Sequence, residues 1–477
     1  MITGSEMAVV DENAAALGVS QRQLMESSGN ALARRIRELT DPESSVTVVA
    51  GRGNNGGDAF VTARFLDEYD LRVCLLGRAE NIGTDIAREN WEALTSLPVD
   101  REEVRNSSDV DLGEPDLLVD AMLGTGVTGA LREPAATAVS AINDASAPVL
   151  SVDVPSGLNA ETGKHPEGAV DPDEVVTFHE TKPGLDDLDA TVTVADIGIP
   201  EAASTFVERG DLQRITRDPD SHKGDNGEVL VIGGGPYVGA PALAAQAALR
   251  AGADLVRINC PTAVAHEVQG YSENLIVRPV EGREFEPGHV GQVMEFAARH
   301  DALVIGPGLG DSEPTLEAAE AILKAFDGTA IIDADALQVV PDLDTQATLI
   351  CTPHQGELKK MGGPGEVDWR ERSKGVAEFA RDIDATMLVK GRYDVISDGG
   401  RTRVNRTGNP GMTVGGTGDV LAGVTGALAA RQEPVHAAAL GAYVAGRAGD
   451  YAAEEHDHGL VATDLLAQIP PAMRREQ

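Results

Sequence analysis

Residues 407–419 read Thr-Gly-Asn-Pro-Gly-Met-Thr-Val-Gly-Gly-Thr-Gly-Asp, and this stretch decides the fold that we expect for the second half of the chain. Five glycines stand in these thirteen residues, and apolar residues then recur at helical spacing through 420–428. The pattern predicts a glycine loop that leads into the N-terminus of a buried helix. Such a junction presents backbone N–H groups and the positive end of the helix dipole, so it favours phosphate.

Asp419 stands at the end of this loop, where a carboxylate would repel phosphate and therefore needs a functional reason. The role that we infer is to take a proton from an attacking hydroxyl during phosphoryl transfer. The alternative interpretation is an aspartate that caps the N-terminus of the helix. The chain has no GxxxxGK[ST] pattern, so a P-loop enzyme is excluded.

Five strands are predicted in the second half, and small or polar residues follow each of them. The strands are 228–232, 302–305, 330–332, 348–351 and 386–389. Ala240, Gly308, His354 and Lys390 stand in the motifs that follow four of them. His354 is interpreted as a substrate contact or, about as readily, as a helix-capping or buried histidine. Lys390 leaves an apolar strand directly, and its burial without an anionic partner would be costly.

The first half begins with the same order of strand, glycine loop and helix. A helical stripe over 21–39 precedes a strand at 46–50, which leads into Gly51-Arg52-Gly53-Asn54-Asn55-Gly56-Gly57-Asp58. Further strands are expected at 71–76, 116–121 and 149–154, with helices near 84–96 and 134–145. This alternation predicts a Rossmann-like parallel sheet with helices on both faces.

Polar loops leave the carboxyl ends of three of these strands, and Asn55, Asp120, Asp153 and Ser156 stand in them. In open parallel sheets ligands bind where such ends converge, so we expect these four side chains to meet at one pocket. Taken singly, each is better explained as a turn residue or a cap. Their joint occurrence favours a site. Lys182, farther along, is a candidate for contact with an anionic ligand.

The composition bounds the class of protein. A chain of 477 residues is expected to form two domains, and the polar, turn-rich stretch at 208–227 places their boundary near residue 213, giving domains 1–213 and 214–477. The formal charge is −38, and only eight of the 39 basic residues are lysine. This balance favours adaptation to a high-salt cytoplasm over an ordinary acidic protein. Nucleic acid and anionic membranes are therefore poor partners.

The three cysteines, Cys74, Cys260 and Cys351, lie far apart and form no CxxC or Cys/His spacing. Neither a zinc site nor a disulfide framework is indicated. The N-terminal residues lack a basic region followed by an apolar one, and no apolar run reaches about 18 residues. We expect a cytoplasmic protein.

Together these motifs resemble a known family, the bifunctional NAD(P)H-hydrate repair enzymes. In the first half the resemblance rests on 54–58, on Val119-Asp120-Ala121 with Gly124-Thr125-Gly126, and on 152–157. In the second half it rests on 222–224, 239–241, 306–310, 333–336, 352–357 and 407–419. It implies an NAD(P)H-hydrate epimerase domain of Rossmann-like three-layer fold, followed by a ribokinase-like α/β domain that is an ADP-dependent NAD(P)H-hydrate dehydratase.

The resemblance also implies site residues in the epimerase domain. The hydrated dinucleotide would contact two loops and Asp153, which is the candidate acid/base. The residues of these loops are Asn54, Asn55, Gly56, Gly57, Asp58, Gly124, Thr125, Gly126, Val127, Thr128, Gly129 and Ala130. Asn55, Asp120 and Ser156 would hold a potassium ion.

In the dehydratase domain the resemblance assigns the hydrate to Ala240, Gly308, His354 and Asp419. The adenine nucleotide would contact Lys390, Gly391, Arg392, Tyr393, Asp394 and Gly418. A magnesium ion is expected at the nucleotide phosphates, although the sequence offers no clear ligand set for it. The expected partners are the hydrates of NADH and NADPH and ADP, with a homo-oligomer as the assembly. The sequence alone does not separate ADP from ATP.

Two rival interpretations stay open at this point. The first is a ribokinase-like small-molecule kinase whose first half is a regulatory dinucleotide-binding module. The second is non-enzymatic, with the first domain as a dinucleotide-sensing or assembly scaffold. Asp153 and the full Asn-Asn-Gly-Gly-Asp motif argue against the scaffold. A stable phosphorylated product would favour the kinase.

Overall fold

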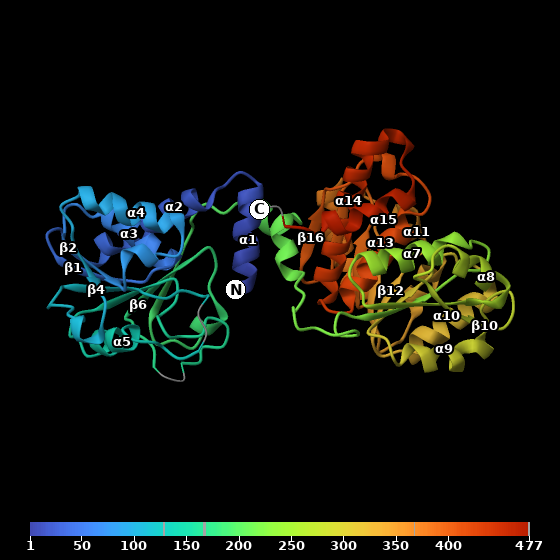
Figure 1. Cartoon of the computed structure of the whole chain (residues 1–477), viewed down its shortest axis with the longest axis horizontal. Coiled ribbons are helices and arrows are strands. Elements are labelled where there is room, and N and C mark those ends of the chain that lie inside the picture. Colours follow the sequence, from blue (N-terminus) through green and yellow to red (C-terminus); the bar gives the residue numbers. More distant parts are fainter. Residues whose placement is uncertain (127–128, 166–167, 367, 476–477) are drawn as a thin grey trace. The chain divides into compact units, whose positions relative to one another are not determined.

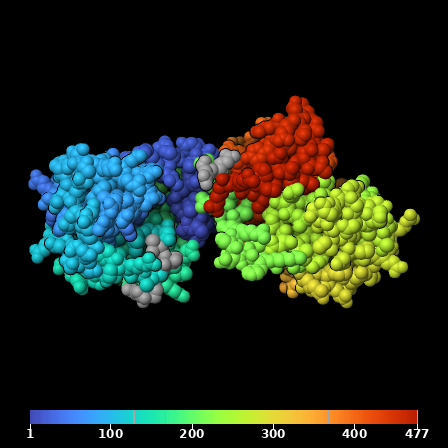
Figure 2. Space-filling view, in the orientation of Figure 1, coloured from blue at the N-terminus to red at the C-terminus, as the bar shows by residue number. Residues whose placement is uncertain are grey.

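Each half of the chain builds a β-sheet that is covered by helices on both faces (Figure 1). The computed structural model describes residues 1–126, 129–165, 168–366 and 368–475. Val127 and Thr128, which we expected in the epimerase site, lie outside the described residues. The chain divides into two units, Met1–Ala203 and Ser204–Gln477, and Figure 2 shows the packed surface of each.

The first unit contains a seven-stranded sheet of order β3-β2-β1-β4-β5-β6-β7, and all of its strand pairs are parallel. The strands are β1 (Ser45–Ala50), β2 (Asp70–Leu76), β3 (Asp100–Val104), β4 (Leu117–Ala121), β5 (Val149–Val152), β6 (Glu174–Phe178) and β7 (Thr191–Ala195). The helices are α1 (Gly4–Ala16), α2 (Gln21–Leu39), α3 (Asn54–Phe65), α4 (Asp85–Ala93) and α5 (Ala135–Asn143), and α6 (Ala202–Thr205) spans the division between the units.

The sequence explains these layers. The central strands β1 and β4 are apolar and buried, because helices cover both faces of the sheet. α2 buries a stripe that includes Leu24, Leu32 and Ile36, and its N-terminus is closed by a capping box at Ser20. α1 to α4 pack on one face, and α5 packs on the other. The predicted three-layer architecture is confirmed.

The second unit contains a nine-stranded sheet of order β10-β9-β8-β11-β12-β13-β14-β15-β16. It is parallel as far as β14, and β15 and β16 add an antiparallel edge. The strands are β8 (Glu228–Ile232), β9 (Leu255–Pro261), β10 (Ile276–Val280), β11 (Ala302–Ile305), β12 (Thr329–Ile332), β13 (Thr348–Cys351), β14 (Ala385–Val389), β15 (Asp394–Ser397) and β16 (Thr402–Asn405). The five strands that we predicted are confirmed.

Two groups of helices cover this sheet. The helices α7 (Gly239–Arg250), α13 (Thr417–Ala429), α14 (Pro434–His456) and α15 (Ala462–Ala472) lie on one face (Figure 1). On the other face lie α9 (Val290–Ala297), α10 (Glu313–Ala325), α11 (Gln355–Lys360) and α12 (Trp369–Asp382), and α8 (Thr262–Gly270) follows β9. A Cβ at Gly423 would stand 2.0 Å from the Ala244 carbonyl oxygen, so α13 and α7 pack with almost no space between them. This contact fixes the helix that carries Asp419.

The stretch after α6 belongs to the second unit. Phe206 forms a β-bridge with Val404, and the Arg403 guanidinium donates to both carboxylate oxygens of Asp211. The segment in which we placed the domain boundary therefore packs on the edge strand β16. Among the residues that the structure describes, no helix is long and apolar enough to cross a bilayer.

Candidate functional site

A cavity of about 1030 Å³ opens in the first unit where the carboxyl ends of β1, β4 and β5 meet. Asn54, Asn55, Asp58, Gly124 and Asp153 are among the residues that line it. Thr125, Gly126 and Ala130 also line the cavity, as do residues of α1 and α2. Its size lies at the upper end of the range for small-molecule sites. Of the four side chains that we expected to meet at one pocket, Asn55 and Asp153 line this cavity, whereas Asp120 and Ser156 are not among its lining residues.

Asp153 is held at the wall of this cavity by a fully buried lysine. The Lys182 ammonium donates to Asp153 Oδ1 at 2.6 Å, and Lys182 also donates to Thr177 Oγ1 and to the Phe178 carbonyl. Thr177 Oγ1 and the Phe178 amide donate to the same carboxylate oxygen. Asp153 itself adopts a left-handed backbone with φ of 64°. We expected Lys182 to contact an anionic ligand, whereas its anionic partner in the structure is Asp153.

Two further carboxyl groups face the same space, Asp11 from α1 and Asp58 from α3. Burial, reinforced by the charge of Asp153, raises the pKa of Asp11 to about 6. Burial also raises the pKa of Asp58 well above its usual range, with smaller contributions from Asp153 and Asp11. Both carboxyl groups therefore hold their protons to higher pH than a free aspartate does, beside a carboxylate that is paired with a cation.

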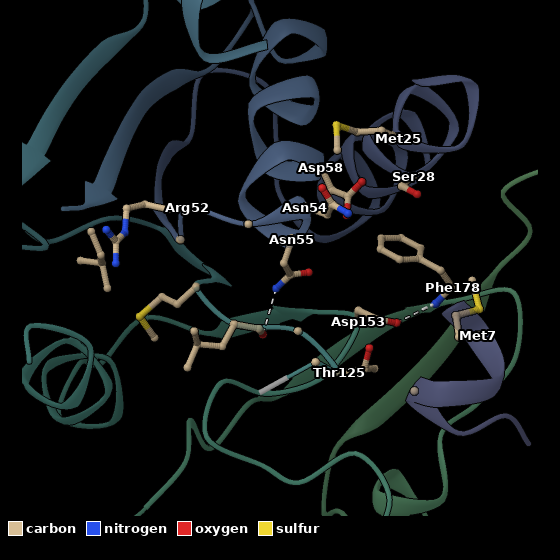
Figure 3. A pocket seen from close by; sticks show the side chains of 18 of the residues that line it. Met7, Met25, Ser28, Arg52, Asn54, Asn55, Asp58, Thr125, Asp153 and Phe178 are labelled. Atoms are coloured by element: carbon tan, nitrogen blue, oxygen red, sulfur yellow. Dashed lines mark hydrogen bonds between the residues drawn. The ribbon is translucent and has the colours of Figure 1, made fainter. Parts of the chain in front are cut away.

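Asn55, Asp120 and Ser156 form a second cluster beneath the cavity. Ser156 Oγ donates to Asp120 Oδ1 at 2.5 Å, the Ser156 amide donates to Oδ2 at 2.8 Å, and Asp120 is fully buried. The Asn55 side-chain amide Nδ2 donates to the Leu123 carbonyl at 3.0 Å (Figure 3). The Leu123 backbone amide donates to Ser156 Oγ. Burial raises the pKa of Asp120, and the hydrogen bonds from Ser156 oppose this.

The chemistry of this cluster fits a hard cation. Asp120, Asn55, Ser156 and the Leu123 carbonyl offer only oxygen ligands around one buried negative charge. Oxygen donors of this kind suit alkali and alkaline-earth ions rather than zinc or copper. Within the described part of the chain, no group of three or more His, Cys, Asp or Glu side chains forms a metal site.

The glycines of the first loop serve close packing. A Cβ at Gly51 would stand 1.8 Å from the Met122 carbonyl oxygen, and one at Gly56 would stand 2.0 Å from the Gly51 carbonyl oxygen. A Cβ at Gly57 would likewise come too close to the Met25 side chain. Gly56 and Gly57 are thus buried behind Asn54 and Asn55, where they let α3 approach the sheet.

This packing gives a prediction for the loop. We expect Gly56→Ala to lower the free energy of unfolding of the first unit by about 3 kcal/mol, because backbone must move to admit the methyl group. Gly53→Ala is the matched control, since a Cβ there meets no atom within 4 Å, and it should change stability by less than about 0.5 kcal/mol. Denaturant titration of both full-length variants compares them, and equal stabilities would contradict the packing role.

The end of the cavity away from Asp153 carries a positive charge. Figure 3 shows Arg52 on the opposite side of Asn55 from Asp153 and Phe178. Thr84 Oγ1 donates to Asn54 Oδ1 at 2.9 Å and so fixes the first asparagine of the motif. Gly129 has φ of +100° and is exposed. The cavity therefore runs from an arginine to a group of three carboxyl groups.

In the second unit a charged cluster lies at the carboxyl ends of β12, β13 and β14. The Lys390 ammonium donates to Asp333 Oδ1 at 2.9 Å, and Thr352 Oγ1 donates to the same oxygen at 2.7 Å. Glu357 Oε2 lies 4.0 Å from the ammonium. Burial opposes the charge of Lys390, but these carboxylates outweigh it and raise its pKa. Lys390 thus has the anionic partner that its position required.

The glycine loop 407–419 brings Asp419 to this cluster. Gly416 caps α13 in a left-handed conformation with φ of 97°, so the predicted junction of glycine loop and helix is confirmed. A Cβ at Gly418 would stand 3.3 Å from Lys390 Nζ and 3.9 Å from Asp333 Oδ2. Burial, followed by the charge of Asp333, raises the pKa of Asp419 to about 7, and Lys390 partly opposes this shift. A carboxyl group with such a pKa suits proton transfer near neutral pH.

The loop 390–394 is shaped by its aspartate. Asp394 Oδ1 accepts from the Gly391 amide and Oδ2 accepts from Asn405 Nδ2, both at 2.9 Å. Burial raises the pKa of Asp394 to about 6. The Arg392 guanidinium lies 5.8 Å from the centre of the Tyr393 ring. Gly391 and Arg392 are exposed, so this loop presents its backbone and one cation to solvent.

His354 is the N-cap of α11. Its Nδ1 accepts from the amides of Gly356 and Glu357, while Glu357 Oε2 accepts from the His354 amide. The helix-capping interpretation is confirmed, and the side chain is still 60% exposed, with Nε2 at 3.5 Å from Glu357 Oε1. Ala240 and Gly308 also meet, since a Cβ at Gly308 would lie 3.2 Å from Ala240 Cβ.

Sequence reasoning missed two functional candidates. Asp11 lies in α1, which we did not predict, and Asp333 stood in a motif without an assigned role. Asp333 could have been found from its position directly after the buried strand 329–332. The sequence contains no comparable signal for Asp11, because apolar residues occur on several faces of its helix.

The fold and the two sites define a class of protein, an enzyme that joins a Rossmann-like domain with a large cavity to a ribokinase-like domain. Residues 229–471 match the family model described as NAD(P)H-hydrate dehydratase, and residues 21–184 match the YjeF-related protein N-terminus. A ribokinase-like superfamily protein from Enterococcus faecalis has a related fold, with a TM-score of 0.51 at 24% identity over 56% of this chain and 95% of that one.

Full-length relatives identify the family. The chain is 42% identical to the bifunctional NAD(P)H-hydrate repair enzyme Nnr of Methanothermobacter thermautotrophicus, over 98% of this chain and 94% of that protein. It is 41% identical to the enzyme of the same name from Archaeoglobus fulgidus, over 99% of this chain and 98% of that one. The chain belongs to the bifunctional NAD(P)H-hydrate repair enzymes.

Proposed function

We propose that the two units act in sequence on damaged NADH and NADPH that carry a hydroxyl at C6. The first unit interconverts the R and S hydrates, and the second dehydrates the S hydrate with ADP, giving NAD(P)H, AMP and phosphate. The observation that carries this proposal is the pair of sites, a dinucleotide-sized cavity with Asp153 and a helix N-terminus with Asp419 beside Lys390. Neither site alone accounts for the whole chain.

In the second unit Asp419 takes the proton of the C6 hydroxyl as that oxygen attacks the terminal phosphoryl group of the nucleotide. The amides of 415–418 and the dipole of α13 stabilise the charge on the transferred group. Lys390 adds a fixed positive charge beside Gly418, and Asp333 and Thr352 hold it in place. The phosphorylated oxygen then leaves more readily than hydroxide, and elimination restores the reduced ring.

The residues of this cluster fit a magnesium ion, which Asp333 would hold beside the nucleotide phosphates. Mg²⁺ in such sites needs only one or two carboxylates from the protein. Asp333 Oδ2 is the oxygen that we assign to it, since Oδ1 accepts from Lys390 and Thr352 while Oδ2 lies toward Gly418. When bound, the ion would neutralise phosphate charge.

The pKa of Asp419 sets the pH dependence of dehydration. The base must be ionised to accept a proton, so we expect the rate to fall about tenfold per pH unit below about pH 7 and to level off above it. Initial rates from purified S hydrate with saturating ADP, measured between pH 5 and 9, test this. A rate that stays constant down to pH 5 would contradict the assignment.

In the first unit we propose that Asp153 is the acid/base and that Asn55, Asp120, Ser156 and the Leu123 carbonyl hold potassium. The ion would offset negative charge where the three strand exits meet. Arg52 suits the pyrophosphate, which would place the hydrated ring at the end of the cavity that holds Asp11 and Asp153.

Potassium gives a prediction of its own. Replacing K⁺ with tetramethylammonium should slow epimer exchange about tenfold or more and leave ADP-dependent dehydration unchanged. Asp120→Asn should weaken the response to added K⁺ by a similar factor, because it removes the one negative charge of the cluster. Exchange that proceeds equally in both salts would refute the ion site.

The second candidate function is a ribokinase-like kinase, which the fold of the second unit favours. Product analysis separates the two. The repair reaction gives a reduced dinucleotide with AMP and phosphate from ADP, whereas a kinase leaves a stable phosphorylated product. Parallel incubations with ADP and ATP decide the phosphoryl donor, and accumulation of a phosphorylated hydrate would overturn the dehydratase proposal.

The composition supports a further proposal about the setting. A charge of −38 with few lysines suits an enzyme that works in a salt-rich cytoplasm, where self-repulsion is screened. The assembly as a homo-oligomer stays a prediction.

A further inference from the structure

We propose that Asp11 is a second catalytic residue of the epimerase cavity and delivers a proton to the ring nitrogen while Asp153 takes one from the C6 hydroxyl. This inference rests on the proposed function of the first unit and extends it to a residue of α1. It rests on the placement of Asp11, on the different donors around Asp11 and Asp153, on the chemistry of the substrate and on the position of Asp58.

One stripe of α1 faces the cavity. Gly4, Met7, Ala8 and Asp11 all line it, and their spacing of three, one and three residues follows a single face of a helix. The buried residues Val9, Val10, Asn13 and Ala14 belong to the rest of the helix. Asp11 is therefore the one charged side chain on a stripe that is otherwise small or apolar, and it is placed inside a binding cavity.

The surroundings of Asp11 and Asp153 differ in the donors that face each carboxyl group. Lys182, Thr177 and the Phe178 amide all donate to Asp153 Oδ1. Asp11 has no such cation at hydrogen-bond distance among its described contacts, and its burial beside Asp153 raises its pKa to about 6. Two carboxyl groups in one site with environments that push them apart form an acid and a base.

Inversion at C6 of the hydrate calls for such a pair. C6 carries both the hydroxyl and the ring nitrogen, so it can open as a hemiaminal. The O–H bond breaks and its proton passes to Asp153; the C6–N1 bond breaks as the C6–O double bond forms, and N1 takes the proton of Asp11. Rotation about C5–C6 and closure on the other face return both protons, so nothing is consumed and no oxidant or reductant is needed.

Asp58 is the other carboxyl group whose pKa is raised, but its position fits the role less well. It is 9% exposed and lies about one turn along α3 from Asn54 and Asn55. Asp11 is only half-buried on the cavity stripe of α1, so its proton can reach both a ligand and solvent. We therefore assign proton delivery to Asp11 and a hydrogen bond to the substrate to Asp58.

The test starts from purified R hydrate without ADP and follows the S hydrate by chromatography in the full-length protein. Asp11→Asn should lower kcat for epimer exchange about a hundredfold or more with KM changed less than threefold, since it keeps the shape of the side chain. Asp11→Glu should recover at least a tenth of the wild-type kcat. Glu12→Gln, one residue farther along α1 and off the cavity stripe, is the matched control and should stay within twofold.

Denaturant titration of each full-length variant confirms that the first unit is folded, and unchanged dehydration of purified S hydrate with ADP confirms that the second unit is intact. The proposal is overturned if Asp11→Asn keeps kcat within threefold of wild type, if its loss lies in KM alone, or if Asp11→Glu is as inactive as Asp11→Asn. If wild-type protein itself does not exchange the epimers, the proposed function of the first unit fails, and that result is distinct from a failure of Asp11 alone.

Discussion

Asp419→Asn is expected to abolish ADP-dependent recovery of reduced nicotinamide from the S hydrate, with a loss in kcat of about a thousandfold. The amide keeps the size of the side chain but cannot accept the hydroxyl proton. Gly416, Gly418 and Lys390 keep their positions, so nucleotide binding should change little. Initial rates with purified S hydrate and saturating ADP measure the effect.

The same protein carries its own control. Exchange between R and S hydrates takes place in the first unit and should proceed at the wild-type rate in Asp419→Asn. Recovery of reduced nicotinamide within tenfold of wild type would show that Asp419 is not the base. The helix-capping interpretation of Asp419 is wrong, because Gly416 is the N-cap of α13 and no described side chain caps that helix.

Asp153→Asn should have the opposite effect. Epimer exchange should fall by about two to four orders of magnitude, while dehydration of the S hydrate with ADP continues at the wild-type rate. From a racemic mixture the S hydrate would disappear and the R hydrate would be left, even with excess ADP. Chromatography of both epimers over time records this directly.

Asp153→Asn also leaves a buried lysine without its carboxylate, which could lower activity by destabilising the unit. The double variant Asp153→Asn with Lys182→Met removes both charges and separates the two causes. If it restores stability without restoring exchange, the loss is one of proton transfer. If it restores exchange as well, Asp153 is not the acid/base.

Much of the fold could be predicted because its strands are short apolar runs that end at turns. β8, β11 and β13 have the bounds that were predicted, since helices bury both of their faces and leave a continuous apolar signal. The strands β7 and β10 are partly exposed, and β15 and β16 mix polar with apolar residues at the antiparallel edge, so their patterns are too weak to read.

The sites divide in the same way. Asn55, Asp120 and Ser156 could be grouped from the sequence because all three follow strands of one parallel sheet, whose carboxyl ends share an edge. The partner of Lys182 could not be predicted, since Asp153 lies 29 residues away in the chain. The two side chains meet because β6 pairs with β5. Asp11 depends on how α1 packs, and α1 has apolar residues on its cavity side and on its core side.

The measurement that tests the central claim most directly is the fraction of a racemic NADPH hydrate that the full-length protein converts with excess ADP in the presence of K⁺. Two coupled activities on one chain predict complete conversion to NADPH, with one AMP and one phosphate for each molecule restored. Conversion that stops at the S hydrate, or that yields a phosphorylated dinucleotide in place of NADPH, would contradict it.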